Sequence, residues 1–413
     1  MNSRKSSPVR PFLPYGKQSI DDSDIAAVAE TLRGDFLTTG PKVGEFEQAF
    51  AHQVGAAEAV ACANGTAALH LAAMALGLGP GDTVLAPSMS FMASANGPHY
   101  TGARIEFMDC DPNAGLVTVD DLREALQRAG GKAKAAVIVH LNGETCDMTA
   151  LRAETQARGM FLIEDACHAL ATRYGHSGEP VGNAMAQVGA CAHSDMACFS
   201  LHPVKTLTTG EGGVVTTNDP KVAARLRRLR AHGIERDAGQ FENREMAFAP
   251  DGSANPWYHE LGQLGFNYRL TDIACALGLS QLRRLEEFAA RRRELKAIYD
   301  RLFDGFQPKV RAVATRQDCD PCRHLYPVLI DFEGLGTDRA TVMRALHGEG
   351  IGTQVHYIPV HRQPYYRRLS PDLELPGADA YYRRALSLPF YVGMSDDDPK
   401  RVVEALRRVL PGA

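Results

Sequence analysis

From about residue 20 to residue 235, short apolar runs alternate with segments in which apolar positions recur at helical spacing. This alternation is typical of a sheet whose parallel strands are joined by crossover helices. Helices are expected between the strands, for example over residues 66–76 and 119–127. We therefore predict an α/β body whose strands are 58–62, 83–87, 104–108, 135–139, 160–164, 196–200 and 213–217.

The pattern changes after residue 235. A polar insert at 235–262 holds the only tryptophan, Trp257, and a long insert of this kind is usually functional or mobile. Apolar positions then recur at helical spacing among many charges, which predicts a long amphipathic connecting helix. A strand at 325–330, a helix opening near 337–338, a strand at 352–356 and a terminal helix from Ser395 predict a smaller α+β domain. The expected division is an arm (1–20), a large domain (21–270), the connecting helix (271–304) and a small domain (305–413).

Composition narrows the class of protein. The chain has 413 residues, and its 45 basic and 49 acidic side chains leave no basic surplus that would predict nucleic-acid binding. Nine cysteines, several inside apolar runs, indicate buried thiols in a reducing compartment. No run approaches the ~18 apolar residues of a membrane span, and the polar first residues lack a signal-peptide core. We predict a soluble, cytoplasmic enzyme without a membrane partner.

Several common binding motifs are missing from the sequence. There is no G-x-G-x-x-G after the first predicted strand and no G-x-x-x-x-G-K-[ST], which argues against a nicotinamide oxidoreductase and against a P-loop enzyme. Cys319, Cys322 and His324 resemble half of a zinc site, but no second ligand pair stands at a suitable spacing. We therefore predict no metal site.

One lysine differs from the others in its surroundings. The chain is uncharged for five residues on each side of Lys205, which lies between two predicted strands, beside hydroxyls and glycines. Burial of this kind makes an amine less basic and a better nucleophile, as Schiff-base chemistry requires. A Schiff-base lysine in turn suggests pyridoxal 5′-phosphate (PLP) as the cofactor.

PLP makes three further demands on a chain, and each has a candidate that follows a predicted strand. Asp165 can hold the ring nitrogen protonated. Gly65, Thr66 and Ala67 open a predicted helix and can bind the phosphate. Phe91 can cover the ring face. Each residue alone has an ordinary structural explanation as a cap, a turn or a core aromatic, so their shared order along the chain favours the cofactor site.

The chain resembles the DegT/StrS family of PLP-dependent sugar-nucleotide aminotransferases over almost its whole length, from about Tyr15 to Leu410. The segments that match the family's motifs, in the family's order, are 38–41, 64–69, 164–168, 199–213 and 265–272. The resemblance implies fold type I, with a large domain on a mixed, mostly parallel sheet and a smaller C-terminal α+β domain. It also implies PLP as cofactor and an obligate homodimer with shared active sites.

Further segments are similar to the pseudaminic-acid branch of this family, which aminates carbon 4 of a UDP-linked 4-keto-6-deoxy-N-acetyl sugar. They are 256–260, 276–282, 324–328 and 354–361. L-Glutamate is the amino donor that the resemblance implies. Three alternatives stay open: amination at carbon 3, the legionaminic type of 4-amination, and a PLP-fold binding protein without catalysis.

The resemblance also implies a role for individual residues. Lys205 and Asp165 would be catalytic, and both would contact the cofactor. The other expected cofactor contacts are Gly65, Thr66, Ala67, Phe91, His168, Ser200 and, from the neighbouring subunit, Asn267. The residues expected to line the sugar-nucleotide pocket are Tyr15, Asp35, Phe36, Leu37, Thr38, Trp257, Gln354, His356 and Tyr357.

Overall fold

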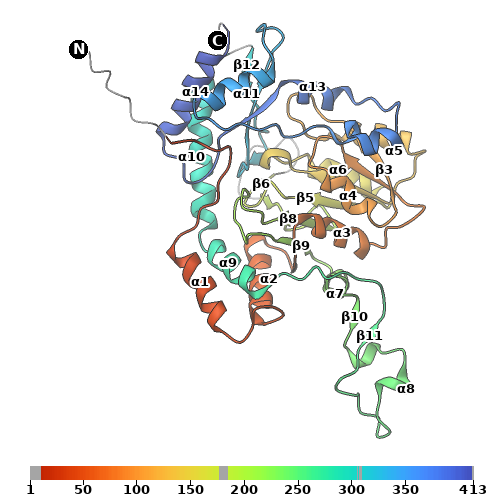
Figure 1. Ribbon diagram of the computed structural model, residues 1–413. Helices are drawn as coiled ribbons and strands as arrows, with labels where there is room; N and C mark the ends of the chain where they lie inside the picture. Colours follow the sequence, from red (N-terminus) through yellow and green to blue (C-terminus); the bar gives the residue numbers. More distant parts are fainter. Residues whose placement is uncertain (1–10, 176–184, 305, 307–308, 412–413) are drawn as a thin grey trace.

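The computed structural model describes residues 11–175, 185–304, 306 and 309–411 (Figure 1). Its centre is a seven-stranded sheet with the order β1-β9-β8-β5-β4-β2-β3. The strands match the predicted ranges, except that the fifth lies one residue further along. They are β1 (Glu58–Cys62), β2 (Thr83–Pro87), β3 (Arg104–Met108), β4 (Ala135–Val139), β5 (Phe161–Asp165), β8 (Met196–Ser200) and β9 (Gly213–Thr217).

The sheet is mixed because of one strand. β9 pairs antiparallel with both β1 and β8, whereas the remaining pairs are parallel. The other six strands therefore all point the same way, and their carboxyl ends lie along one edge of the sheet. All five residues of β4 are buried, as expected for an apolar strand that is covered on both faces.

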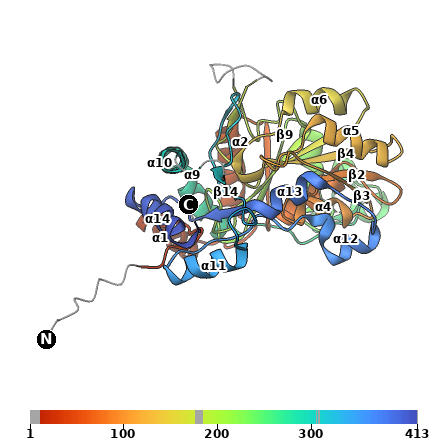
Figure 2. The same ribbon diagram turned by 90° about the horizontal axis from the view of Figure 1, so that it is seen from above.

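Helices form a layer on each face of this sheet (Figure 2). On one face α3 (Gly65–Ala75) packs against α4 (Ala93–His99), and on the other α5 (Val119–Arg128) packs against α6 (Met148–Gln156). A capping box opens α5, since the Asp121 carboxylate accepts from the backbone N–H of Thr118 and the Thr118 hydroxyl accepts from that of Asp121.

The connecting helix is divided in two, contrary to the prediction of a single helix. α9 (Asp272–Leu282) ends before α10 (Leu285–Phe303), and the backbone of Arg284 between them is not helical. The Arg284 side chain forms ion pairs with Asp21 and Asp24 at the start of α1 (Asp22–Arg33). Charge pairing with the first helix therefore holds the junction, a contact that helical periodicity alone cannot reveal.

The small domain has its own sheet and its own core. β12 (Val310–Ala312), β14 (Tyr326–Ile330) and β15 (Ala385–Leu388) form an antiparallel sheet in that order, packed with α10, α11 (Arg339–Gly348) and α14 (Asp397–Val409). The predicted strand at 352–356 is wrong. Only Ile351 and Gln354 form isolated bridges there, and Ser387 of β15 supplies the partner for Gln354.

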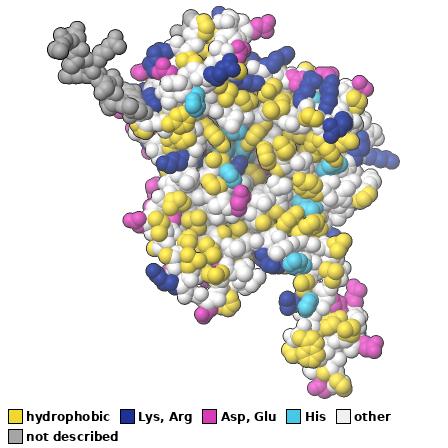
Figure 3. Space-filling model, in the orientation of Figure 1, with side chains coloured by type: hydrophobic (Ala, Val, Ile, Leu, Met, Phe, Trp, Pro, Cys, Tyr) yellow, Lys and Arg dark blue, Asp and Glu magenta, His cyan; other side chains and the backbone are white. Residues whose placement is uncertain are grey.

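The polar insert at 235–262 is also more ordered than predicted. Strands β10 (Ile234–Glu235) and β11 (Glu260–Leu261) pair at its base, and the chain between them, with α8 (Arg244–Ala247), projects away from the body (Figure 1). The Glu260 carboxylate orders it by accepting hydrogen bonds from the N–H groups of Glu242 and Asn243, both at 2.8 Å. Apolar side chains lie on its surface (Figure 3), and the exposed ones include Met246, Trp257 and Leu261.

Candidate functional site

A cavity of about 610 Å³ lies where the carboxyl ends of the central strands meet the small domain. It has the size that small-molecule sites usually have, and its place at the strand ends is where α/β folds bind ligands. Large-domain residues in its lining are Gly65, Thr66, Phe91, Asp165, His168, Ser200 and Lys205. Tyr15 and the segment 354–358 close it from the other side.

Lys205 follows β8 in a turn in which its backbone N–H donates to the carbonyl of His202 at 2.8 Å. The amine lines the cavity, and burial lowers its pKa. Nearby Cys167 and Asp165 oppose that shift. A larger fraction of the amine is therefore neutral near pH 7 than for an exposed lysine, and a neutral amine can accept a proton or attack a carbonyl.

Asp165 is the last residue of β5, and both of its carboxylate oxygens are held. Oδ2 accepts from the Ser94 hydroxyl at 2.5 Å, and Oδ1 accepts from the Cys167 N–H at 3.2 Å. The Ser94 hydroxyl oxygen is in turn 2.5 Å from that of Ser90. Because the only hydroxyl proton of Ser94 goes to the carboxylate, Ser90 must be the donor in this second bond. A chain of two hydroxyls thus fixes the carboxylate in the cavity wall.

The start of α3 offers a place for an anion. The side chain of Asn64 caps the Ala67 N–H at 2.9 Å, and its carbonyl accepts from Ala68, but the N–H groups of Gly65 and Thr66 bond to no residue that the structure describes. A Cβ on Gly65 would lie 2.8 Å from the Cβ of Ser200, so only glycine allows this close approach. Two free N–H groups at a helix start, beside the hydroxyls of Thr66 and Ser200, fit a phosphate.

His168 is connected to both sides of the cavity. Its Nδ1 accepts from the Asn142 N–H at 3.3 Å, and its Nε2 lies 3.0 Å from the Tyr357 hydroxyl. Burial, then the charge of Lys205, holds the pKa of His168 well below its ordinary value, so the ring is neutral. With Nδ1 as acceptor the proton is on Nε2, which donates to Tyr357. The Tyr357 hydroxyl proton is then free to point to a ligand.

Two further histidines share this wall. Burial lowers the pKa of His356 to about 3, and its Nδ1 is 2.8 Å from the Ser387 hydroxyl. Burial also holds the pKa of His324 well below its ordinary value, and its ring lies 4.6 Å from that of His168. The cavity wall therefore includes a carboxylate fixed by hydrogen bonds, an amine of lowered pKa and three neutral imidazoles.

The chain matches a known protein family over almost its whole length. The model of the DegT/DnrJ/EryC1/StrS aminotransferase family matches residues 18–407. The chain is a member of this aminotransferase family. Spore coat polysaccharide biosynthesis protein SpsC of Bacillus subtilis (strain 168) is 39% identical over 405 residues, covering 97% of this chain and 98% of that protein.

Solved structures agree on the fold. Spr1654 of Streptococcus pneumoniae, solved in PLP and PMP forms, superposes with a TM-score of 0.82 at 26% identity and covers 96% of this chain and 98% of its own. PseC of Helicobacter pylori, an aminotransferase involved in the biosynthesis of pseudoaminic acid, gives 0.83 at 24% identity, covering 96% of this chain and 99% of its own. These are fold-type I transferases, as the sequence predicts.

Some of the expected site residues of this aminotransferase lie away from the cavity. Asp35 and Phe36 line a second hollow of about 370 Å³, and Leu37 and Thr38 lie at the surface beside them. Trp257 is 74% exposed on the projecting insert, and Asn267 is exposed where its backbone bridges to Ala231. Ala67 is buried behind the helix start, with its N–H capped by Asn64. The residues outside the cavity could reach a ligand only in the cavity of a second subunit. Ala67 would contribute only by forming the start of the helix.

The site also depends on residues in and behind the cavity wall to which the sequence analysis assigned no role. Ser90 and Ser94 hold Asp165, Asn142 orients His168, and His324 lines the wall. Serine and asparagine are common throughout proteins, so nothing in the local sequence distinguishes Ser94 or Asn142. His324 does stand in a segment that resembles a family motif, and that resemblance could have identified it.

No helix in the described part of the chain is long and apolar enough to cross a membrane.

Proposed function

We propose that this aminotransferase transfers the amino group of L-glutamate to carbon 4 of a UDP-linked 4-keto-6-deoxy-N-acetylhexosamine, with PLP as cofactor. The observation that carries the proposal is the meeting of Lys205, Asp165 and the free N–H groups of Gly65 and Thr66 around one cavity. The products are a UDP-4-amino-4,6-dideoxy sugar and 2-oxoglutarate, as in pseudaminic acid biosynthesis.

The cavity residues fit PLP. The N–H groups of Gly65 and Thr66 and the Ser200 hydroxyl would hold its phosphate, Asp165 its ring nitrogen, and Phe91 one face of its ring. When bound, PLP supplies an aldehyde that takes up the amino group and a ring that accepts electrons. His168 and Tyr357 would face its hydroxyl side.

The side chains of the chain itself provide the proton chemistry. Lys205 Nζ, whose pKa burial lowers, would take the proton from the α-carbon of the amino donor and release it to the cofactor's 4′ carbon within the same half-reaction. In the second half-reaction it would move a proton from that carbon to carbon 4 of the sugar. The Asp165 carboxylate, held by Ser94 and the Cys167 N–H, would pair with the ring nitrogen in front of it. The neutral rings of His356 and His168 can donate or accept hydrogen bonds without adding charge beside the amine.

The choice of substrate is supported by the family and by named relatives. The names of SpsC and PseC refer to polysaccharide and pseudoaminic acid biosynthesis, respectively. The segments 256–260 and 354–361 resemble the pseudaminic-acid branch. Amination at carbon 3 and the legionaminic type of 4-amination are the alternatives that substrate assays must separate.

A homodimer with shared sites belongs to the proposal. Among the described residues of one chain, Lys205 is the only lysine or arginine in the cavity lining, so a nucleotide diphosphate has no arginine to meet there. Arg236 and Arg244 stand on the projecting insert, beside exposed apolar residues. An insert reaching across to a second copy would bring these two arginines, among the insert's more numerous acidic residues, to that copy's cavity, and Asn267 with them.

An absorbance titration tests the proposal. The purified protein should show a visible cofactor band that L-glutamate removes and the UDP-4-keto sugar restores. Lys205→Ala should keep PLP without covalent attachment and lose turnover, because no other amine lines the described cavity. Lys221→Ala, at an exposed site on α7 (Pro220–Leu229), is the matched control and should behave as wild type.

Each failure has its own meaning. Near-normal turnover by Lys205→Ala would refute the assigned mechanism. Loss of the band with glutamate, but no return with this sugar, would keep the aminotransferase and reject the substrate. A protein that shows no band even after added PLP would favour the binding-protein alternative.

A further inference from the structure

His324 is a cavity residue whose side chain has no partner in the described structure. It is 3% exposed, and its Nδ1 is buried without a hydrogen bond. The ring lines the cavity beside His168, and its Nε2 makes no hydrogen bond to a described residue either. Buried polar groups are nearly always paired, so an unpaired ring in a binding cavity indicates that a ligand completes it.

The protonation state of the ring follows from its surroundings. Burial is the main cause that keeps the pKa of His324 low, with smaller contributions from Lys205, His168 and Arg292. The neutral ring has one N–H. An enclosed N–H without an acceptor costs more than an enclosed lone pair, so Nδ1 is the bare nitrogen and Nε2 carries the proton. The ring thus presents a donor to the cavity.

The backbone of His324 is fixed by a buried arginine. Arg292 of α10 is 2% exposed, and its Nη1 donates to the carbonyls of Arg323 and His324, each at 3.2 Å. No described acidic residue pairs with Arg292, and its guanidinium lies 5.6 Å from the Phe390 ring centre. A buried cation of this kind is costly, and here it serves two carbonyls at the cavity edge.

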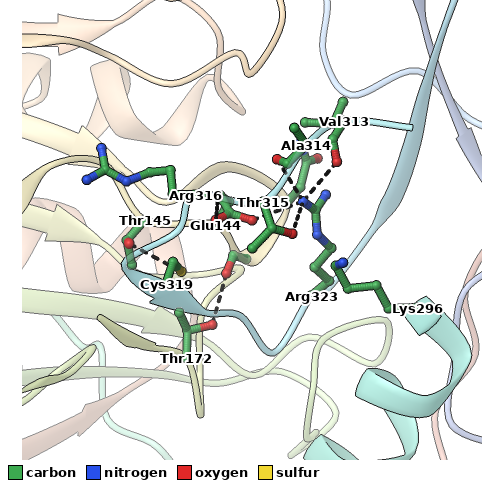
Figure 4. Close-up of polar contacts among 12 residues, drawn as sticks. Glu144, Thr145, Thr172, Lys296, Val313, Ala314, Thr315, Arg316, Cys319 and Arg323 are labelled. Atoms are coloured by element: carbon green, nitrogen blue, oxygen red, sulfur yellow. Dashed lines mark hydrogen bonds and ion pairs between the residues drawn. The ribbon is translucent and has the colours of Figure 1, made fainter. Parts of the chain in front are cut away.

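The other side of the same segment is held as firmly. The His324 N–H donates to the Asn142 carbonyl at 2.9 Å. The neighbouring Arg323 forms a buried ion pair with Glu144 at 2.9 Å and donates to the carbonyls of Val313 and Ala314 (Figure 4). With its backbone fixed from three directions, His324 is preorganised to meet a ligand atom without an ordering cost.

We propose that His324 donates a hydrogen bond from Nε2 to an oxygen atom of the keto-sugar substrate, and that Arg292 is the positioning residue that holds it. The inference rests on the proposed function for the identity of the ligand. The sugar is favoured over the cofactor because His168 and Tyr357 already face the side on which the cofactor's hydroxyl is expected, whereas His324 has no other partner.

Measuring the two half-reactions separately tests the proposal in the holoenzyme. His324→Leu should slow the reaction with the UDP-4-keto sugar about 10- to 100-fold, the effect of losing one buried hydrogen bond to a ligand. The reaction with glutamate should stay within about twofold, and so should the PLP dissociation constant. His324→Gln, which keeps an N–H donor, should recover part of the loss. His52→Leu, on the exposed face of α2 (Pro41–Val54), is the control.

A double-mutant cycle tests the part played by Arg292. Arg292→Lys should slow the sugar reaction, and it should add nothing in the His324→Leu background if it acts through His324. Equal slowing of both half-reactions by Arg292→Lys, or full additivity with His324→Leu, would show a general structural role and overturn this assignment.

Other outcomes are equally decisive. Unchanged sugar rates in His324→Leu would refute the donor role, and weaker PLP binding in that variant would assign the oxygen to the cofactor instead. If the wild-type enzyme turns over no such sugar, the proposed function fails. The role of His324 is then decided by calorimetric binding of UDP-N-acetylglucosamine, which should be weaker in His324→Leu and would be equal if the inference is wrong.

Discussion

The two hydroxyls behind Asp165 make a sharp test of how the site is held together. Ser94, which is fully buried, donates to the Asp165 carboxylate, whereas Ser90 donates only to Ser94. A hydrogen bond to a charged group contributes about 1.5–3 kcal/mol, and one between neutral groups about 0.5–1.5 kcal/mol. Ser94→Ala should therefore destabilise the protein about twice as much as Ser90→Ala, although both changes remove a single oxygen atom.

The assay is thermal unfolding of the cofactor-free protein, since bound cofactor would add its own stabilisation. With an unfolding entropy of about 2.1 cal/mol/K per residue, 413 residues give roughly 0.9 kcal/mol/K. Ser94→Ala should thus lower the Tm by roughly 2–3.5 °C, and Ser90→Ala by roughly 0.5–1.5 °C. An equal or larger effect of Ser90→Ala would refute the direction of the hydroxyl chain, in which Ser94 donates to the carboxylate and Ser90 donates to Ser94.

Three further predictions concern other parts of the site. Gly65→Ala places a Cβ 2.8 Å from that of Ser200 and should weaken PLP binding at least about tenfold by fluorescence titration, whereas Gly44→Ala, with open space around it, should have no effect. Because the pKa of His356 is about 3 in the folded protein and about 6.5 in the unfolded chain, the unfolded chain binds more protons between these values. Stability should then fall with decreasing pH, by about 2 kcal/mol at pH 5 for this residue, and His356→Asn should flatten the change in Tm between pH 7 and pH 5. Glu144→Gln leaves Arg323 buried without its carboxylate and should cost about 3–5 kcal/mol in urea unfolding, against almost nothing for the exposed Glu124→Gln; a cost under about 1 kcal/mol would show that the carbonyls alone hold Arg323.

The sequence predicted the central sheet well because its strands are buried on both faces. A run such as Ala135–Val139 must be apolar throughout, and this requirement is local. The strands of the small domain were harder to predict from the sequence. The strand expected at 352–356 is wrong, and the third strand comes from Ala385–Leu388 instead. Pairing with β14 decides which of the two short segments becomes a strand, and such long-range pairing leaves no mark in either segment.

Some residues of the site could likewise be predicted from the sequence, and others could not. Residues that directly follow strands, such as Gly65, Asp165 and Ser200, could be placed together because the carboxyl ends of parallel strands share one edge. His324 and Arg292 come from a loop and a helix whose approach to that edge depends on packing between the two domains. The antiparallel direction of β9 was equally hidden in its own apolar residues.

One physical cause, exclusion of water, sets the protonation of most groups in this cavity, and it acts in opposite directions on acids and bases. Burial lowers the pKa of Lys205 and of His168, and it raises the pKa of Tyr357. All three therefore tend toward their neutral forms. At the Asp165 carboxylate a hydroxyl and an N–H donate to the two oxygens and replace the water that the group has lost. The cavity consequently places a carboxylate held by two hydrogen bonds in the same wall as a lysine whose amine can accept a proton, and this pairing of unlike environments is what proton transfer at a carbon atom requires.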